Sequence, residues 1–110
     1  MKEAEIRKKA IKILTDRNWI CWFPSKVRYK QNDIFGIIDL LAIKRKKMKK
    51  IQLTTLPNLS IKRKKITNFL KKNKVQMTVE VWAWSKKKKQ FKKENINIKI
   101  KKKLKRPIGG

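Results

Sequence analysis

Residues 33–43, with the sequence DIFGIIDLLAI, constrain this chain more than any other segment. Within them, residues 37–43 are apolar except for Asp39. An apolar run at consecutive positions is typical of a central strand, because both faces of such a strand are buried. Burying an unpaired carboxylate is costly, so Asp39 needs a metal ion, a cation or a hydrogen-bond network as its partner.

The residues that follow predict a hairpin and then a helix. A basic turn over residues 44–47 leads into a strand over residues 48–54, which we expect to pair with the first strand. Pro57 and Asn58 break the chain before a helix over about residues 60–73. We expect that helix to turn its apolar residues inward, namely Ile61, Ile66, Phe69 and Leu70.

The remaining elements complete an α/β or α+β fold. Periodicity predicts a helix over residues 2–17 and strands over residues 19–23, 75–84 and 90–100. The predicted order is α-β-β-β-α-β-(β), which is typical of a mixed sheet flanked by helices. With 110 residues the chain is one domain, expected over residues 1–100, followed by a basic and mobile tail over residues 101–110.

Composition narrows the function classes. The chain has 34 Lys or Arg and 7 Asp or Glu, so its net charge of +27 favours salt-sensitive binding to phosphate backbones. Because Lys greatly outnumbers Arg, the bias is equally typical of an A/T-rich coding sequence with many solvated lysines. The absence of His excludes an imidazole base, and the single Cys21 excludes an intrachain disulfide.

No membrane segment is expected. The chain has no apolar run near the ~20 residues of a membrane span, and its first residues match an amphipathic helix rather than a secretory signal. These features favour the cytoplasm, a reducing compartment, as its location.

Asp39 has candidate partners for a cation site. If the hairpin forms, Gln52 lies near Asp39, Thr54 points to the same face as Gln52, and Asp33 can approach from the preceding loop. A carboxylate, an amide oxygen and backbone carbonyls suit a hard cation such as Mg²⁺ or Mn²⁺. Simpler roles are a structural ion pair for Asp39, a buried amide for Gln52, and a turn or cap for Asp33.

Four features follow one another along the chain: D-x-F-G-x-x-D at residues 33–39, Q-x-T at residues 52–54, a basic helix, and V-W-x-W at residues 81–84. In this order they resemble the PD-(D/E)XK nuclease superfamily, and more narrowly its small Holliday-junction-resolvase-like proteins of restriction-endonuclease-like fold. The resemblance covers about residues 19–84 and Phe91. It implies a Mg²⁺- or Mn²⁺-dependent DNA endonuclease, with branched or junction DNA as a candidate substrate. It also implies a homodimer, although the sequence shows no dimer interface.

The resemblance assigns roles to individual residues. Asp39 corresponds to the metal-binding Asp, and Gln52 takes the place of the acid of the E-x-K motif. Thr54 stands where the catalytic Lys usually stands, so a lysine of the following helix would replace it, Lys65 before Lys62 in order of preference. Glu3 is the candidate for the helix carboxylate that the superfamily often adds, with Asp33 as a further metal ligand.

The basic residues around these motifs are candidate DNA contacts: Arg28, Lys30, Lys62, Arg63 and Lys65. Arg28 and Lys30 fit a solvated loop equally well. The alternative function is a non-catalytic, basic nucleic-acid-binding protein that keeps a degraded nuclease fold. A small ribosomal or architectural protein is a third class, but phosphate binding alone does not require a carboxylate inside an apolar strand.

Overall fold

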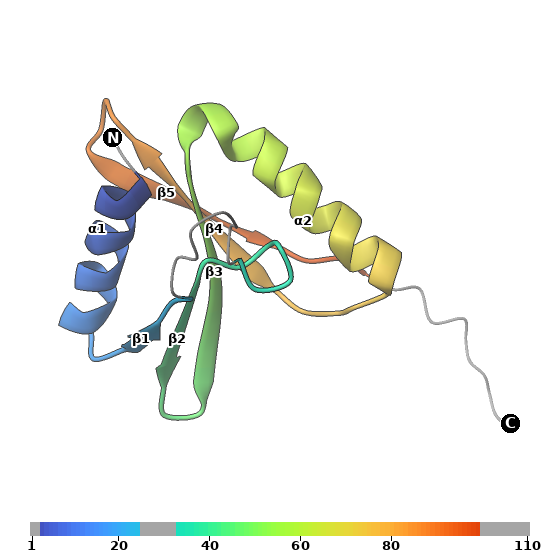
Figure 1. Ribbon diagram of the computed structural model, residues 1–110, viewed down its shortest axis with the longest axis horizontal. Coiled ribbons are helices and arrows are strands. Elements are labelled where there is room, and N and C mark those ends of the chain that lie inside the picture. The colour runs from blue at the N-terminus through green and yellow to red at the C-terminus, as the bar shows by residue number, and fades with distance from the viewer. Residues whose placement is uncertain (1–2, 25–32, 100–110) are drawn as a thin grey trace, which may run out of the picture.

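The computed structural model describes residues 3–24 and 33–99, which form a helix, a sheet and a second helix in three layers (Figure 1). Along the chain the elements are α1 (Glu3–Asp16), β1 (Ile20–Trp22), β2 (Leu40–Lys44), β3 (Lys47–Thr55), the short 3-10 helix η1 (Leu56–Asn58), α2 (Leu59–Asn73), β4 (Val79–Ser85) and β5 (Gln90–Ile96). The strands of this described part lie in the order β1-β2-β3-β4-β5. The α/β mixed sheet flanked by helices, predicted from the sequence, is therefore confirmed.

A tight turn joins β2 and β3. Lys44 pairs with Lys47, and Arg45 adopts a positive φ of 56° between them. The antiparallel register then places Leu40 opposite Ile51. Since the residues before and after such a pair also face each other, the register brings Asp39 to Gln52. The hairpin predicted from the basic turn is confirmed.

Helix α1 covers one face of the sheet. Ile6, Ala10 and Leu14 recur every four residues and are buried, as expected for the inner stripe of an amphipathic helix. They pack against alternate residues of three strands: Leu40, Ala42, Ile51, Leu53, Trp82 and Trp84. Both tryptophans of β4 are thus packing residues.

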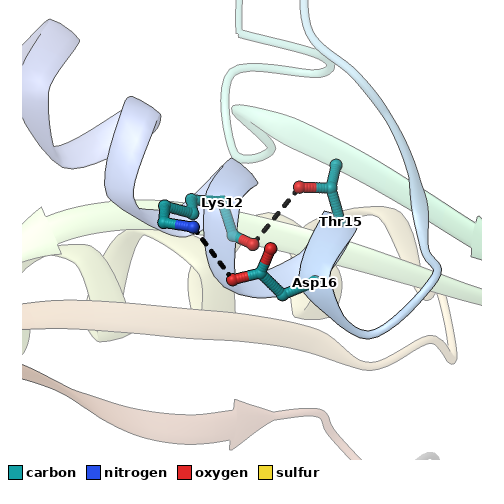
Figure 2. A network of polar contacts seen from close by, with 3 residues as sticks. All are labelled: Lys12, Thr15 and Asp16. Atoms are coloured by element: carbon teal, nitrogen blue, oxygen red, sulfur yellow. Dashed lines mark hydrogen bonds and ion pairs between the residues drawn. The ribbon is translucent and has the colours of Figure 1, made fainter.

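The outer face of α1 is polar. Lys12 Nζ lies 3.1 Å from Asp16 Oδ2, and Thr15 Oγ1 donates a hydrogen bond to the Lys12 carbonyl oxygen at 3.2 Å (Figure 2). Both charged side chains are largely exposed. Such an i, i+4 pair is screened by water and contributes little to stability.

Helix α2 covers the opposite face of the sheet and connects the parallel strands β3 and β4 (Figure 1). Parallel neighbours need a crossover of this kind because their ends lie far apart. The helix buries Leu59, Ile66 and Leu70 against the other alternate set of strand residues, among them Val79, Val81 and Ala83. The two apolar faces of β4 therefore belong to the two separate layers of the core.

Several sequence expectations are wrong in detail. Residues 37–43 were expected to form one strand around Asp39, but β2 starts at Leu40 and Asp39 lies in the bend before it, because residues 34–38 form a turn. The last strand was expected over residues 90–100, but β5 ends at Ile96. Ile61 was expected to point inward, but it is 63% exposed, because the helix starts at Leu59 and its buried stripe runs through Leu59 and Ile66. Strand β4 starts at Val79 and not at residue 75, since residues 75–78 pair with no strand in the described part of the chain. None of the helices in residues 3–24 and 33–99 is long and apolar enough to cross a membrane.

Candidate functional site

A tight turn precedes β2. The Ile37 N–H donates to the Ile34 carbonyl oxygen at 3.0 Å, and Ile34 pairs with Ile38 in an antiparallel bridge. The turn requires positive φ at Phe35 (55°) and Gly36 (74°), a conformation that costs glycine nothing.

This turn explains the spacing of the D-x-F-G-x-x-D motif. Because Ile34 and Ile38 face each other across the turn, the next residue pair outward is Asp33 and Asp39. Asp33 is therefore a neighbour of Asp39, although turn or cap roles were the simpler expectation for it. The F-G dipeptide between the two acids is the sequence signal for this proximity, because it marks the residues that form the turn.

Asp39 is fixed to β3 through both its backbone and its side chain. Its N–H donates to the Ile51 carbonyl oxygen at 2.8 Å. Its Oδ2 accepts hydrogen bonds from Gln52 Nε2 at 2.5 Å and from the Leu53 N–H at 2.8 Å. The proximity of Asp39 and Gln52 that the hairpin predicted is thus present, and these bonds hold the carboxyl in one orientation.

The pKa of Asp39 is raised to about 7. Burial is the largest cause, a side-chain hydrogen bond with Asp33 and the charges of Asp33 and Glu3 add to it, and the Leu53 N–H opposes the shift. Because burial and nearby negative charge both disfavour an ionised carboxyl, Asp39 keeps its proton up to near-neutral pH. Glu3 acts on Asp39 from the first turn of α1.

Gln52 contributes an unsatisfied oxygen to this site. Its side chain is 1% exposed, and its Nε2 is engaged with Asp39. Its Oε1 is buried and accepts no hydrogen bond from the residues that the structure describes. A buried acceptor without a donor is costly, so this oxygen favours a cation or a water molecule beside it.

The residues present fit a hard divalent cation. The oxygens of Asp33, Asp39 and Gln52 are the donor types that Mg²⁺ and Mn²⁺ prefer. Within residues 3–24 and 33–99, no three Cys, Asp or Glu side chains are close enough to hold an ion by themselves, so the ligand set would need the amide. Over the same residues neither Asp33 nor Asp39 forms an ion pair with Lys or Arg, which is the simpler role that Asp39 could have had.

Thr54 cannot supply a charge to this site. It is buried in β3 at the same sheet face as Gln52, two residues away. A cationic group must therefore come from elsewhere, and α2 packs on that face.

The burial pattern of α2 distinguishes its two candidate lysines. Lys62 is half-buried and lies three residues after the buried Leu59, whereas Lys65 is exposed. Lys62 also lies seven residues before Phe69, hence on the same flank of the helix. The Phe69 ring lies 6.0 Å from that of Phe35, in the turn between Asp33 and Asp39. Lys65 lies one turn before Phe69, so burial alone separates the two lysines, and it favours Lys62, the reverse of the order preferred from the sequence.

The other candidate basic residues separate into two groups. Arg63 forms a two-point ion pair with Glu94 of β5, with Nε–Oε1 and Nη2–Oε2 distances of 2.9 Å. Its guanidinium is thus already occupied on the flank of α2 opposite to Lys62. Arg28 and Lys30 lie outside the described residues.

Comparison of the chain with protein-family models, with curated proteins and with solved structures found no match. The site is therefore interpreted from its own geometry.

Proposed function

We propose that the chain is a metal-dependent DNA endonuclease of the PD-(D/E)XK type. The observation that carries the proposal is the convergence of Asp33, Asp39 and Gln52, where a buried amide oxygen lacks a donor and a carboxyl keeps its proton to near-neutral pH. Perturbed carboxyls at a buried polar cluster are typical of catalytic sites. Branched or junction DNA belongs to the candidate substrates on the resemblance alone.

The roles of the acidic and amide residues follow from their chemistry. Mg²⁺ or Mn²⁺, when bound, would supply Lewis-acid polarisation of a phosphodiester and a more acidic water molecule. Asp39 and Asp33 would hold the ion through their carboxylates, and Asp39 must lose its proton to do so. Gln52 would place its Oε1 on the same ion while its Nε2 keeps Asp39 in position. Glu3 would add negative charge from α1.

The role of Lys62 follows from its place on α2. Phosphodiester hydrolysis develops negative charge on the phosphate oxygens, and an ammonium group held beside them stabilises that charge. Lys62 is half-buried on the flank of α2 that contacts the Asp33–Asp39 turn through Phe69. The net charge of +27 would draw the DNA backbone toward this site.

One observation favours the second candidate function, a non-catalytic nucleic-acid-binding protein. The buried Thr54 occupies the position of the usual lysine, and Gln52 replaces an acid. A protein of this kind would bind DNA but would not cleave it with any metal ion. Binding and cleavage must therefore be measured separately.

The test uses labelled linear and four-way-junction DNA with Mg²⁺, with Mn²⁺ or with a chelator. We expect cleavage that depends on the metal ion and falls about 10³-fold or more in Asp39→Ala, while DNA binding is retained. The matched control is Asp16→Ala, which removes an exposed carboxylate from α1. Binding without cleavage under every metal condition would overturn the proposal and support the second candidate.

A further inference from the structure

Trp19 lies at the end of the sheet where β2 and β3 are joined by their turn. That turn extends beyond α1 at the bottom of Figure 1. Trp19 is half-buried and lines two surface grooves. The first groove, of about 430 Å³, is lined by Trp19, Lys44, Arg45, Lys46 and Lys47. The second, of about 370 Å³, crosses from β3 to β5 and is lined by Trp19, Lys47, Met48, Lys49, Lys50, Thr78, Glu80 and Asn95.

Two ammonium groups lie close to the indole ring. Lys49 Nζ lies 5.2 Å from the Trp19 ring centroid, and Lys44 Nζ lies 5.8 Å from it. Trp19 packs with the core layer of α1, and Lys44 and Lys49 lie two residues from Ala42 and Ile51 of that layer. All three side chains therefore share the α1 face of the sheet.

Basic side chains outnumber acidic ones around this ring. Glu80 is the acid among the residues lining the grooves, and it already accepts from Lys49 Nζ at 2.9 Å and from Trp82 Nε1 at 3.1 Å. Burial lowers the pKa of Lys93, the charges of Arg17 and Lys49 lower it further, and Glu80 opposes the shift. A bound anion such as phosphate lowers the electrostatic repulsion between cations that lie this close together.

This surface is separate from the candidate metal site. Gln52 follows Ile51 in β3, so it points to the face covered by α2, whereas Trp19 and Lys49 belong to the α1 face. Asp39 is five residues from Lys44, which corresponds to about 17 Å along the strand. A ligand held at Trp19 would therefore leave the Asp39 site accessible.

We propose that Trp19, with Lys44 and Lys49, binds single-stranded nucleic acid by stacking on an unpaired base. The lysines of the β2–β3 turn would hold the adjacent phosphates. A duplex offers no free base face along its length, so an indole flanked by cations selects an unpaired strand. A second copy of the chain is a poor occupant because it would bring another +27 charge. The inference shares with the proposed function only the premise of nucleic-acid binding and requires no cleavage.

The test measures fluorescence anisotropy of a labelled oligothymidine of about 16 nucleotides in the presence of a chelator. For the unaltered protein we expect tighter binding to this strand than to an abasic strand of the same length. Trp19→Ala should raise the Kd for oligothymidine about 5- to 100-fold, the range covered by base–aromatic stacking, and should not change the Kd for the abasic strand or for duplex DNA. Trp19→Phe should retain most of the affinity.

Trp22→Ala is the matched control. Trp22 is 55% exposed and pairs with Leu41, so it lies on the α2 face of the sheet, away from the lysines around Trp19. Equal losses in Trp19→Ala and Trp22→Ala, or equal losses for oligothymidine and duplex, would overturn the inference. Equal affinity of the unaltered protein for the oligothymidine and the abasic strand would also overturn it, whether or not the variants fold. Asp39→Ala should bind oligothymidine with unchanged Kd. A failure of the nuclease proposal, seen as absent cleavage, is therefore distinguishable from a failure of this inference, seen as absent base-dependent binding.

Discussion

At one end of the β2–β3 hairpin, two carboxyls and an amide hold one another in place around Asp39, and the pKa of that residue is raised to about 7. At the other end, lysines surround an indole ring and two open grooves. The first end is buried, and its polar groups are fixed by the strand register. The second opens onto two grooves, and of the two lysines nearest the ring Lys49 is paired with Glu80.

The difference in burial and hydrogen bonding suits the two ends of the hairpin to different tasks. Fixed donors in a water-poor site can orient a cation and reactants, because little reorganisation is needed. Lysines around a flat ring suit many sequences, since they would contact phosphates and the ring would contact any base. We therefore assign chemistry to the Asp39 end and retention of the strand to the Trp19 end.

The largest expected effect is the pH dependence of stability at the Asp39 end. The pKa of Asp39 is about 7 when folded and 3.8 as its ordinary value, so between these values the folded protein binds more protons than the unfolded chain. Its contribution to stability is therefore greatest near pH 4 and falls by up to about 4 kcal/mol as the pH rises to 8. The free energy of unfolding is measured by denaturant titration at each pH, with a chelator present to remove metal ions.

Asp39→Asn is the reference for that measurement, because it keeps the shape and removes the proton. The difference in unfolding free energy between the variant and the unaltered protein should change with pH across this window and level off above it. Asp33 and Glu3 raise the same pKa, so Asp33→Asn should shift the window to lower pH. A difference that does not change with pH would show that Asp39 ionises normally.

A smaller effect distinguishes Lys62 from Lys65. Both substitutions to Ala remove one charge from α2, so DNA binding should weaken equally and slightly in the two variants. Cleavage should fall about 10²-fold in Lys62→Ala, as for other groups that stabilise developing charge, and should stay nearly unchanged in Lys65→Ala.

A compensating variant sharpens the same test. Thr54→Lys in the Lys62→Ala background places a lysine at the motif position and should recover part of the activity. Loss of cleavage in Lys65→Ala with none in Lys62→Ala would restore the order that the sequence alone suggested. Circular dichroism checks folding, since Thr54 is buried.

The smallest expected effect concerns a pair outside both ends. Lys12 and Asp16 form an exposed i, i+4 pair on α1, with side chains 77% and 63% exposed. Asp16→Ala should lower the unfolding free energy by about 0.3–0.5 kcal/mol or less, and high salt should remove the effect. A loss of cleavage or of oligothymidine binding in this variant would show that overall charge, and not the two local sites, governs both activities.

Several features of the site were predictable because their signals are local. The apolar run predicted a strand, of which the structure forms Leu40–Lys44, and the basic turn after it predicted the hairpin that brings Asp39 to Gln52. The alternation of residues in β4 predicted which side chains share a face. Each of these patterns has a period of two residues or depends on one tight turn.

Other features were not predictable from periodicity. Ile66 and Leu70 face inward on α2 as predicted, but Ile61 does not, because it is as apolar as Leu59 and only packing against the sheet decides which is buried. The same packing leaves Lys62 half-buried and Lys65 exposed. The sequence did not indicate the surface around Trp19, because its grooves are lined by residues from strands that are distant in the sequence.

The sequence by itself determined the order of helices and strands, the apolar faces, and the strong attraction to polyanions, because these depend on neighbouring residues and on total charge. Three facts required the tertiary structure: Asp33 and Glu3 act on Asp39, Gln52 Oε1 has no donor among the described residues, and Lys44 and Lys49 lie beside Trp19. These facts depend on the distance between side chains that are far apart along the chain. Strand register and helix packing fix such distances only once the whole sheet has formed.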